Sequence, residues 1–240
     1  MIELSPAPAA LAADRRVYAV GDIHGCLDQL RALHAAIAAD LAARPIRHAS
    51  LIHLGDLIDR GPDSAQVVRH LASGTAPPGI TETITLRGNH EAMMLAAIEA
   101  PETDGAARLW ILNGGADALL SWGVPRQTEP KDWGTRLPAA DLAYLRALPF
   151  RHVDGGYLFV HAGIRPRVPL DRQEPHDLMW IREPFLSSGE DHGAVIVHGH
   201  TPRPQPEVRA NRIGIDTGAV MGGRLTCLVL ESDRLGFLLA

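Results

Sequence analysis

The chain has 240 residues and a formal net charge of -5 at pH 7. This length suits one large α/β domain that buries its own core, and the negative charge argues against nucleic acid as the main partner. The single lysine, Lys131, and the lack of a G-x-x-x-x-G-K-[ST] pattern disfavour Schiff-base chemistry and a P-loop.

Cysteine content and the N-terminus indicate the compartment. Cys26 and Cys227 are too few for a disulfide framework, and no C-x-x-C pattern occurs. Residues 1–14 are rich in Ala and Pro without a basic start, which predicts a frayed arm rather than a secretory signal. No apolar run approaches the roughly 18 residues of a membrane span. We expect a soluble cytoplasmic protein without a membrane partner, and the oligomeric state stays open.

The first part of the chain alternates apolar runs with helical patterns. Short apolar runs at 17–22, 50–56 and 83–89 end in polar, glycine-bearing turns and predict buried strands. Ala/Leu-rich stretches at 27–43 and 64–73 separate these runs and predict helices. This order indicates βαβ crossovers and a largely parallel sheet.

The rest of the chain changes pattern twice. Residues from about 91 to 150 predict a helical insertion, and strands are expected again at 157–163 and 195–200. After residue 212, glycine turns separate short strands without helices, which predicts antiparallel hairpins added to a second sheet. We expect one α/β domain over residues 1–240, with an N-terminal arm to about residue 16.

Potential metal ligands follow five predicted strands. The carboxyl ends of strands in an open α/β sheet border a ligand crevice, so these side chains are expected to converge. Two carboxylates, three imidazoles and one amide suit Mn²⁺, Fe or Zn²⁺. Six ligands exceed what one catalytic metal with open positions needs, so two metals are expected. The six residues are Asp22, His24, Asp56, Asn89, His161 and His200.

The same loops carry residues suited to a phosphoryl group. The guanidinium groups of Arg60 and Arg182 match two phosphate oxygens. His90 follows Asn89 and is placed to protonate a leaving oxygen, with Asp59 fixing the other ring nitrogen.

Five motifs in order carry a family resemblance: "GDIHG", "GDLIDRGPDS", "RGNHE", "HAG" and "HGHT". Together they resemble the metal-dependent serine/threonine phosphoprotein phosphatases of the calcineurin-like phosphoesterase superfamily, and most of all its bacterial and lambda-phage branch. The resemblance covers Val17 to about Val229. It implies two facing mixed β-sheets flanked by helices, with metals at one edge.

The resemblance also implies a role for each site residue. Asp56 would bridge two metals, and Pro202, which stands where many relatives have the second histidine of a G-H-x-H motif, would leave the first metal more open. His90 with Asp59 would be the acid pair, and Arg60 with Arg182 would hold phosphate. The first metal would be held by Asp22, His24 and Asp56, and the second by Asp56, Asn89, His161 and His200.

The implied function is a phosphoester hydrolase that uses water activated by a dinuclear metal centre, with Mn²⁺ favoured. The expected substrate is phosphoserine or phosphothreonine in a protein or peptide. Dinucleoside tetraphosphate hydrolysis is the alternative, because the motifs read only the phosphate. A non-catalytic metal- or phosphate-binding regulator is disfavoured, because the acid pair and both arginines are present.

Several residues outside the motifs have competing interpretations. Trp110, Trp122 and Trp133 are expected to pack the insertion, with a platform for a peptide or nucleobase as the alternative. Trp180 is expected to support Arg182.

Cys26 is expected to be half-buried rather than redox-sensitive. His198 is excluded from direct metal ligation, with an indirect contact left open. The stretches "LNGG" (112–115) and "GIDTGAV" (214–220) are typical of the bacterial branch but receive no role. The other histidines are expected at the surface or in the core: His34, His48, His53, His70, His152, His176 and His192.

Overall fold

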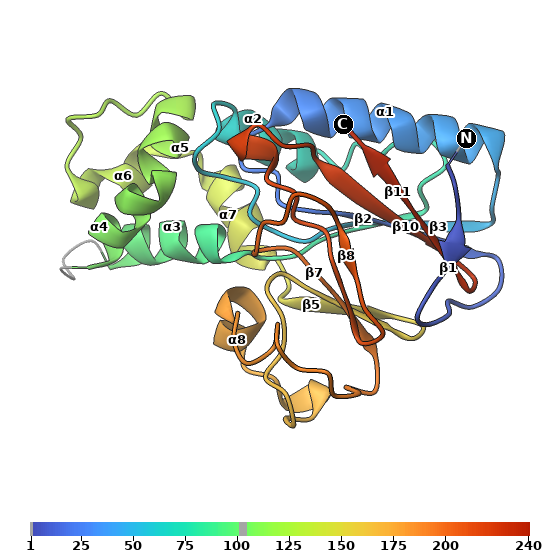
Figure 1. Cartoon of the computed structure of the whole chain (residues 1–240). Helices are drawn as coiled ribbons and strands as arrows, with labels where there is room; N and C mark the ends of the chain where they lie inside the picture. The colour runs from blue at the N-terminus through green and yellow to red at the C-terminus, as the bar shows by residue number, and fades with distance from the viewer. Residues whose placement is uncertain (1, 101–104) are drawn as a thin grey trace.

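Two mixed β-sheets face each other and carry helices on their outer sides (Figure 1). The computed structural model describes residues 2–100 and 105–240. The expected α/β class with two facing mixed sheets is confirmed. No helix in these ranges is both long and apolar enough to cross a membrane.

The first sheet has six strands in the order β1-β11-β10-β2-β3-β4. Strands β2, β3 and β4 run parallel, and helices α1 and α2 make the crossovers between them, as predicted. The bounds are β1 Ser5–Pro6, β2 Arg15–Val20, α1 Leu27–Ala43, β3 His48–His53, α2 Ser64–Ala72, β4 Glu82–Thr85, β10 Thr226–Glu231 and β11 Arg234–Leu239.

The second sheet has five strands in the order β5-β6-β7-β9-β8. Strands β6, β7 and β9 are parallel, while β5 and β8 pair antiparallel at the two edges. The bounds are β5 Arg151–Asp154, β6 Tyr157–Val160, β7 Val195–His198, β8 Glu207–Val208 and β9 Arg212–Gly214, with α8 at Pro175–Trp180 and short 3-10 turns at Leu170–Arg172 and Ala219–Met221.

The alternation of side chains along β2 explains the layers. Val17 and Ala19 face the second sheet and pack in a core with Phe159, whereas Tyr18 and Val20 face the helices. All five are fully buried. A third apolar cluster packs α8 on the far side of the second sheet, which makes both faces of each sheet buried over much of their length.

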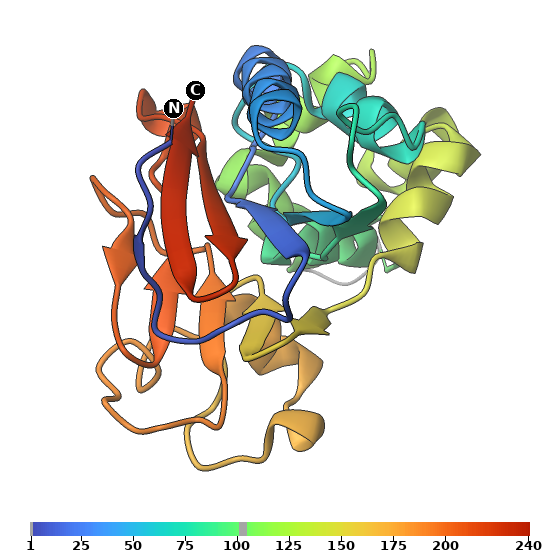
Figure 2. The ribbon, with the colours of Figure 1, turned by 90° about the vertical axis from the view of Figure 1, so that its right-hand side faces the viewer.

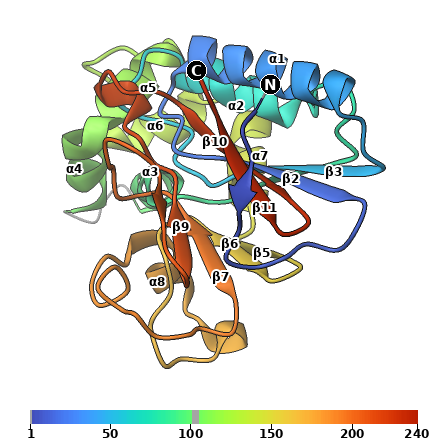
Figure 3. The ribbon, with the colours of Figure 1, turned by 45° about the vertical axis from the view of Figure 1, so that its right-hand side comes forward.

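A group of short helices projects from one side of the sandwich, at the left in Figures 1 and 3. This is the predicted helical insertion, of which residues 101–104 lie outside the described ranges. The bounds are α3 Asn89–Glu99, α4 Ala106–Trp110, a π-helical turn Ile111–Gly115, α5 Ala116–Ser121, α6 Pro130–Arg136 and α7 Ala139–Ala147.

Two expectations about the ends of the chain are wrong. The C-terminal hairpin β10–β11 joins the first sheet beside β2, and only the hairpin β8–β9 extends the second. The N-terminal segment is not frayed over its described part, because β1 pairs with β11 and Leu11 is buried in the core between the sheets. Figure 2 shows this segment running beside β11 before it enters β2.

Candidate active site

The predicted site residues other than Arg182 follow the carboxyl ends of β2, β3, β4, β6 and β7. Among the described residues, two groups of three side chains place potential ligand atoms within 4.8 Å of one another. One group is His24, Asp56 and His90, and the other is Asp56, His161 and His200. Asp56 belongs to both groups. The sequence therefore identified the residues of one buried cluster that span five separate segments of the chain.

Backbone strain is concentrated in this cluster. Eight non-glycine residues of the described chain have positive φ, and five of them are site residues. Such conformations cost free energy and persist where the surrounding fold imposes them, commonly at functional sites. The five are His24 (45°), Asp56 (50°), Asp59 (74°), Arg60 (67°) and His200 (64°).

Asp56 is held by its backbone and its carboxylate. Its N–H donates to Glu91 Oε2 at 2.9 Å, and its Oδ1 accepts the N–H of His90 at 3.0 Å. Its Oδ2 lies 3.3 Å from Nε2 of His161 and 3.5 Å from Nε2 of His24. A Cβ at position 88 would lie 2.2 Å from Asp56 Oδ1, so only glycine fits at Gly88. The carboxylate is therefore fixed between two sets of histidines.

The ring of His161 is oriented by a hydrogen bond to the backbone just after β3. Its Nδ1 donates to the Leu54 carbonyl at 3.0 Å, so Nε2 points to the cluster. This Nε2 lies 2.9 Å from Oδ1 of Asn89, which begins helix α3. The amide oxygen and the imidazole nitrogen thus converge on one position beside Asp56.

Asp22 and His200 are joined across 178 residues. Both carboxylate oxygens of Asp22 accept the His200 N–H, at 3.2 and 3.0 Å. Gly199 allows this approach, because a Cβ there would lie 2.0 Å from Asp22 Oδ1. Asp216 is also buried nearby, and burial together with the Asp216 charge raises the pKa of Asp22 well above its ordinary value. Two adjacent buried carboxylates indicate a place for positive charge.

His24 and Arg60 form the opposite side of the cluster. Nδ1 of His24 donates to the Ile58 carbonyl at 2.8 Å, and Arg60 Nη1 lies 3.0 Å from His24 Nε2. Burial lowers the pKa of His24 to about 4, so the ring is neutral at pH 7 and can accept a bond at Nε2. The Arg60 guanidinium therefore lies directly at the metal-ligand cluster.

His90 and Asp59 form a buried pair at 2.6 Å between Nδ1 and Oδ2. Burial raises the pKa of Asp59, although His90 and the indole of Trp110 oppose this rise. Burial opposes protonation of His90, but Asp56 and Asp59 raise its pKa above the ordinary value. The remaining ring nitrogen, Nε2, lies 3.9 Å from Asp56 Oδ2 and faces the cluster. This arrangement suits a proton donor, and the same position also suits a metal ligand.

Arg182 lies just after α8 and is exposed. The pKa of His200 falls to about 3 mainly because its ring is buried. The charges of His161 and Arg182 lower this pKa further, whereas Asp56 raises it. Arg60 lies beside His24, and the charge of Arg182 acts on His200. This placement suits a phosphoryl group bound between the two arginines.

The donor set fits divalent cations. Nε2 of His200 is buried and has no hydrogen-bond partner among the described residues, which is expected of a nitrogen that ligates a metal. Burial disfavours charge on Asp56, yet His161 and His90 lower its pKa well below the ordinary value, while Asp56 raises that of His161 to about 10. Metal binding at His161 would therefore release a proton.

Sequence reasoning missed three buried residues that support the site. Glu91 accepts backbone N–H groups from Asp56, Leu57 and Gly88, at 2.8 to 2.9 Å. Asp216 lies beside Asp22, although its stretch was noted. Trp110 contacts Asp59 through its indole N–H. Glu91 ends the "RGNHE" motif and Asp216 lies in the "GIDTGAV" stretch, whereas Trp110 only precedes "LNGG", and none of these patterns defines a chemical role by itself.

The tryptophans mostly pack, as expected. Trp110 and Trp133 are 0% and 5% exposed and stack edge to face at 5.4 Å, so neither offers a face to a nucleobase. Trp122 is half-buried and donates to Asp141 at 2.8 Å. Trp180 has the rings of His200 at 6.5 Å and His176 at 6.1 Å as neighbours, and its expected support of Arg182 stays a prediction.

His198 faces away from the cluster, where its ring packs edge to face on Phe185 at 5.1 Å. Its exclusion from direct ligation agrees with this position. Cys26 is half-buried, and burial raises the pKa of its thiol, which disfavours the reactive thiolate. Among the other histidines, His34 and His53 are buried and His176 is exposed.

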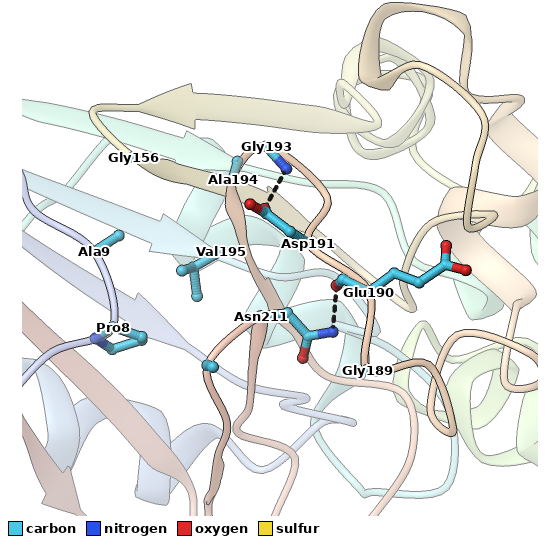
Figure 4. Close-up of a pocket in the computed structure, with 11 residues that line it drawn as sticks. Pro8, Ala9, Gly156, Gly189, Glu190, Asp191, Gly193, Ala194, Val195 and Asn211 are labelled. Atoms are coloured by element: carbon cyan, nitrogen blue, oxygen red, sulfur yellow. Dashed lines mark hydrogen bonds between the residues drawn. The ribbon is translucent and has the colours of Figure 1, made fainter.

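A pocket of about 460 Å³ lies away from this cluster, at the N-terminal ends of β6 and β7 (Figure 4). Its polar groups bond within their own loop: the Asp191 carboxylate accepts the Gly193 N–H at 2.8 Å, and Asn211 donates to the Glu190 carbonyl at 2.8 Å. The pocket contains none of the candidate ligands, so the strand-end cluster is the better candidate for chemistry.

A sequence model of the calcineurin-like phosphoesterase family matches residues 15–223. The chain belongs to this family. It is therefore a metallophosphoesterase, and proteins of this family use divalent metals to act on phosphoesters. The family expected from the sequence motifs is confirmed.

The relatives carry two kinds of name. Serine/threonine-protein phosphatase 1 of Salmonella typhimurium is 32% identical over 88% of this chain and 90% of that protein. The symmetrical bis(5'-nucleosyl)-tetraphosphatase of Methylococcus capsulatus is 33% identical over 62% of this chain and 44% of that protein. A crystal structure provisionally named a diadenosine tetraphosphatase aligns with a TM-score of 0.65 at 24% identity, over 96% of this chain and 98% of that one, and supports the fold.

Proposed function

We propose that this metallophosphoesterase is a phosphomonoesterase that hydrolyses phosphoserine or phosphothreonine in proteins. The observation that carries the proposal is Asp56, shared by two histidine-containing groups beside the Asp59–His90 pair. The similarity to a serine/threonine-protein phosphatase over 90% of that protein's length supports the substrate class.

The cluster would hold two cations that share Asp56. When bound, the divalent cations, for which we propose Mn²⁺, supply the positive charge that activates water for attack on phosphorus. One group of ligands would be Asp22, His24 and Asp56, and the other Asp56, Asn89, His161 and His200.

The protein's own residues would orient the phosphoryl group and supply a proton. Arg60 and Arg182 would donate hydrogen bonds to its non-bridging oxygens and stay charged at any working pH. His90 would give the proton on Nε2 to the departing serine or threonine oxygen, while Asp59 holds the opposite nitrogen. These roles need no nucleophilic serine or cysteine.

Dinucleoside tetraphosphate hydrolysis is the second candidate, since relatives named tetraphosphatases match 62% or more of this chain. The burial of Trp110 and Trp133 removes two of the aromatic walls that a purine pocket would need.

Parallel assays distinguish the candidates. The kcat/KM values for a phosphoserine peptide and for diadenosine tetraphosphate are measured with Mn²⁺, with Asp56→Asn as the control that assigns turnover to this cluster. A higher value for the peptide is expected. Preference for the dinucleotide would establish the second candidate, and no turnover of either compound or of p-nitrophenyl phosphate would favour a binding protein.

A further inference from the structure

Trp110 connects the helical insertion to the proposed acid pair. It ends helix α4, is fully buried, and donates its indole N–H to Asp59 at 2.9 Å from Oδ1 and 3.0 Å from Oδ2. His90 donates to the same carboxylate at 2.6 Å. Asp59 is thus held between a ring that faces the cluster and a ring that belongs to the insertion.

The turn that follows Trp110 contacts the next residue of the site. The Gly114 carbonyl accepts the backbone N–H of Arg60 at 3.2 Å. Gly114 has φ of 103°, and a Cβ there would lie 2.8 Å from the Arg60 nitrogen. A Cβ on Gly115 would lie 2.6 Å from the Trp110 ring. Both glycines of the "LNGG" stretch are therefore required by this contact.

We propose that residues 110–115 are a positioning element for the reaction: Trp110 fixes the Asp59 carboxylate against His90, and Gly114 fixes the backbone of Arg60. The proposal rests on the proposed function, because it takes His90 as the proton donor. It gives the insertion a part in the chemistry, beyond packing on the sandwich.

The physical reason is the geometry of a buried carboxylate. With two donors, one on each side, the Asp59 carboxylate has a defined orientation, and the His90 proton on Nδ1 has a defined acceptor. Without the indole donor, the carboxylate can rotate, and His90 loses the fixed direction of Nε2. A misdirected proton donor slows departure of a basic oxygen and matters little for an oxygen that leaves readily as an anion.

The test is Trp110→Phe, which keeps an aromatic ring and removes the N–H. On a phosphoserine peptide kcat is expected to fall about tenfold, which is part of the roughly 10²–10⁴-fold that general-acid help is typically worth. On p-nitrophenyl phosphate kcat should change less than twofold, and KM should stay the same on both. Trp122→Phe is the matched control, because Trp122 also donates to an aspartate of this region, Asp141, which is absent from the site.

Equal losses of kcat on both substrates in Trp110→Phe, or no loss, would overturn the proposal while leaving the hydrolase function intact. A wild-type protein that turns over neither substrate would instead overturn the proposed function. Gly114→Ala tests the other half of the element: KM is expected to rise on both substrates without selectivity between leaving groups.

A spectroscopic readout covers the case in which Trp110→Phe does not fold. In protein labelled with ¹⁵N-tryptophan, Asp59→Asn is expected to shift the indole N–H resonance of Trp110 and leave those of Trp122 and Trp133 in place. An unchanged Trp110 resonance would show that the contact with Asp59 does not form and would overturn the proposal.

Discussion

Glu91 holds the backbone of Asp56 through a hydrogen bond of 2.9 Å from the Asp56 N–H to Oε2. The second oxygen of Glu91 accepts the Leu57 N–H at 2.8 Å, and Oε2 also accepts the Gly88 N–H at 2.8 Å. Glu91 is fully buried on α3, so one side chain connects the ends of β3 and β4 to the helix that carries Asn89 and His90. The positive φ of Asp56 is maintained by this contact.

Glu91→Gln is therefore expected to lower the free energy of unfolding by about 1–3 kcal/mol, the cost of a buried polar group left unpaired. An amide has one oxygen, so its NH₂ group would face a backbone N–H. Urea unfolding in EDTA measures this change without a contribution from metal. Glu99→Gln on the same helix is the control, since the side chain of Glu99 is 55% exposed. Equal effects of the two substitutions would contradict the role given to Glu91.

Asp56→Asn should weaken both proposed metal sites, because Asp56 alone belongs to both groups of ligands. Metal content after dialysis against Mn²⁺ is expected to fall below that of His24→Asn or His200→Asn, and kcat is expected to fall further as well. Full metal content in Asp56→Asn, or full activity of the metal-stripped wild type, would refute the shared site.

Arg182→Lys tests the proposed phosphate contact. Lysine keeps the charge but loses the planar pair of donors, so KM for a phosphoserine peptide should rise and kcat should fall. Arg167→Lys is a control, because Arg167 is exposed and pairs with Glu190 at 2.6 Å. Kinetics of Arg182→Lys that match the wild type would place Arg182 outside the site.

Local motifs explain why so much of the site was predictable. Asp22, His24 and Asp56 lie within a few residues of strand ends, and the parallel order of β2 and β3 brings such ends to one edge of a sheet. The Ala/Leu-rich stretch likewise predicted α1 at its observed bounds, 27–43. These features depend on neighbours in the sequence.

Contacts between distant segments were not predictable in the same way. Trp110 meets Asp59 only because the insertion packs onto the loop after β3, and the sequence pattern of an amphipathic helix does not specify its partner. The hairpin β10–β11 was expected in the second sheet, because turn residues predict a hairpin but not the sheet edge that it joins. Leu11 anchors an Ala/Pro-rich arm whose composition favours fraying.

Three histidines away from the site give a pH dependence of stability. Nε2 of His34 lies 3.2 Å from Nε2 of His53, and His70 Nε2 lies 3.3 Å from the other nitrogen of His34. Burial lowers the pKa of His34 to about 4 and that of His53 well below its ordinary value. The unfolded chain, with histidine pKa near 6.5, therefore binds more protons as the pH falls below that value.

Stability from these histidines is thus fully present above about pH 6.5 and declines as the pH falls toward 4, by at most about 1.4 kcal/mol per pH unit for each histidine. His34→Gln should flatten this decline, whereas His176→Gln, at an exposed position, should not. Urea unfolding between pH 7.5 and 5 in EDTA provides the comparison. Identical slopes for His34→Gln and the wild type would contradict the linkage.

The role of His90 as proton donor can be separated from a role as metal ligand. Its position beside His24 and Asp56 is compatible with both, whereas its 2.6 Å contact with Asp59 favours the acid. A serine alkoxide is strongly basic and needs a proton to leave, while p-nitrophenolate leaves readily as an anion. General-acid help is typically worth about 10²–10⁴-fold, so His90→Asn should lower kcat far more on a phosphoserine peptide than on p-nitrophenyl phosphate. Asp59→Asn should show a weaker form of the same selectivity.

Metal content, measured on the same samples, should match the wild type if His90 is the acid. Equal losses of kcat on the two substrates, together with loss of metal, would reassign His90 as a ligand.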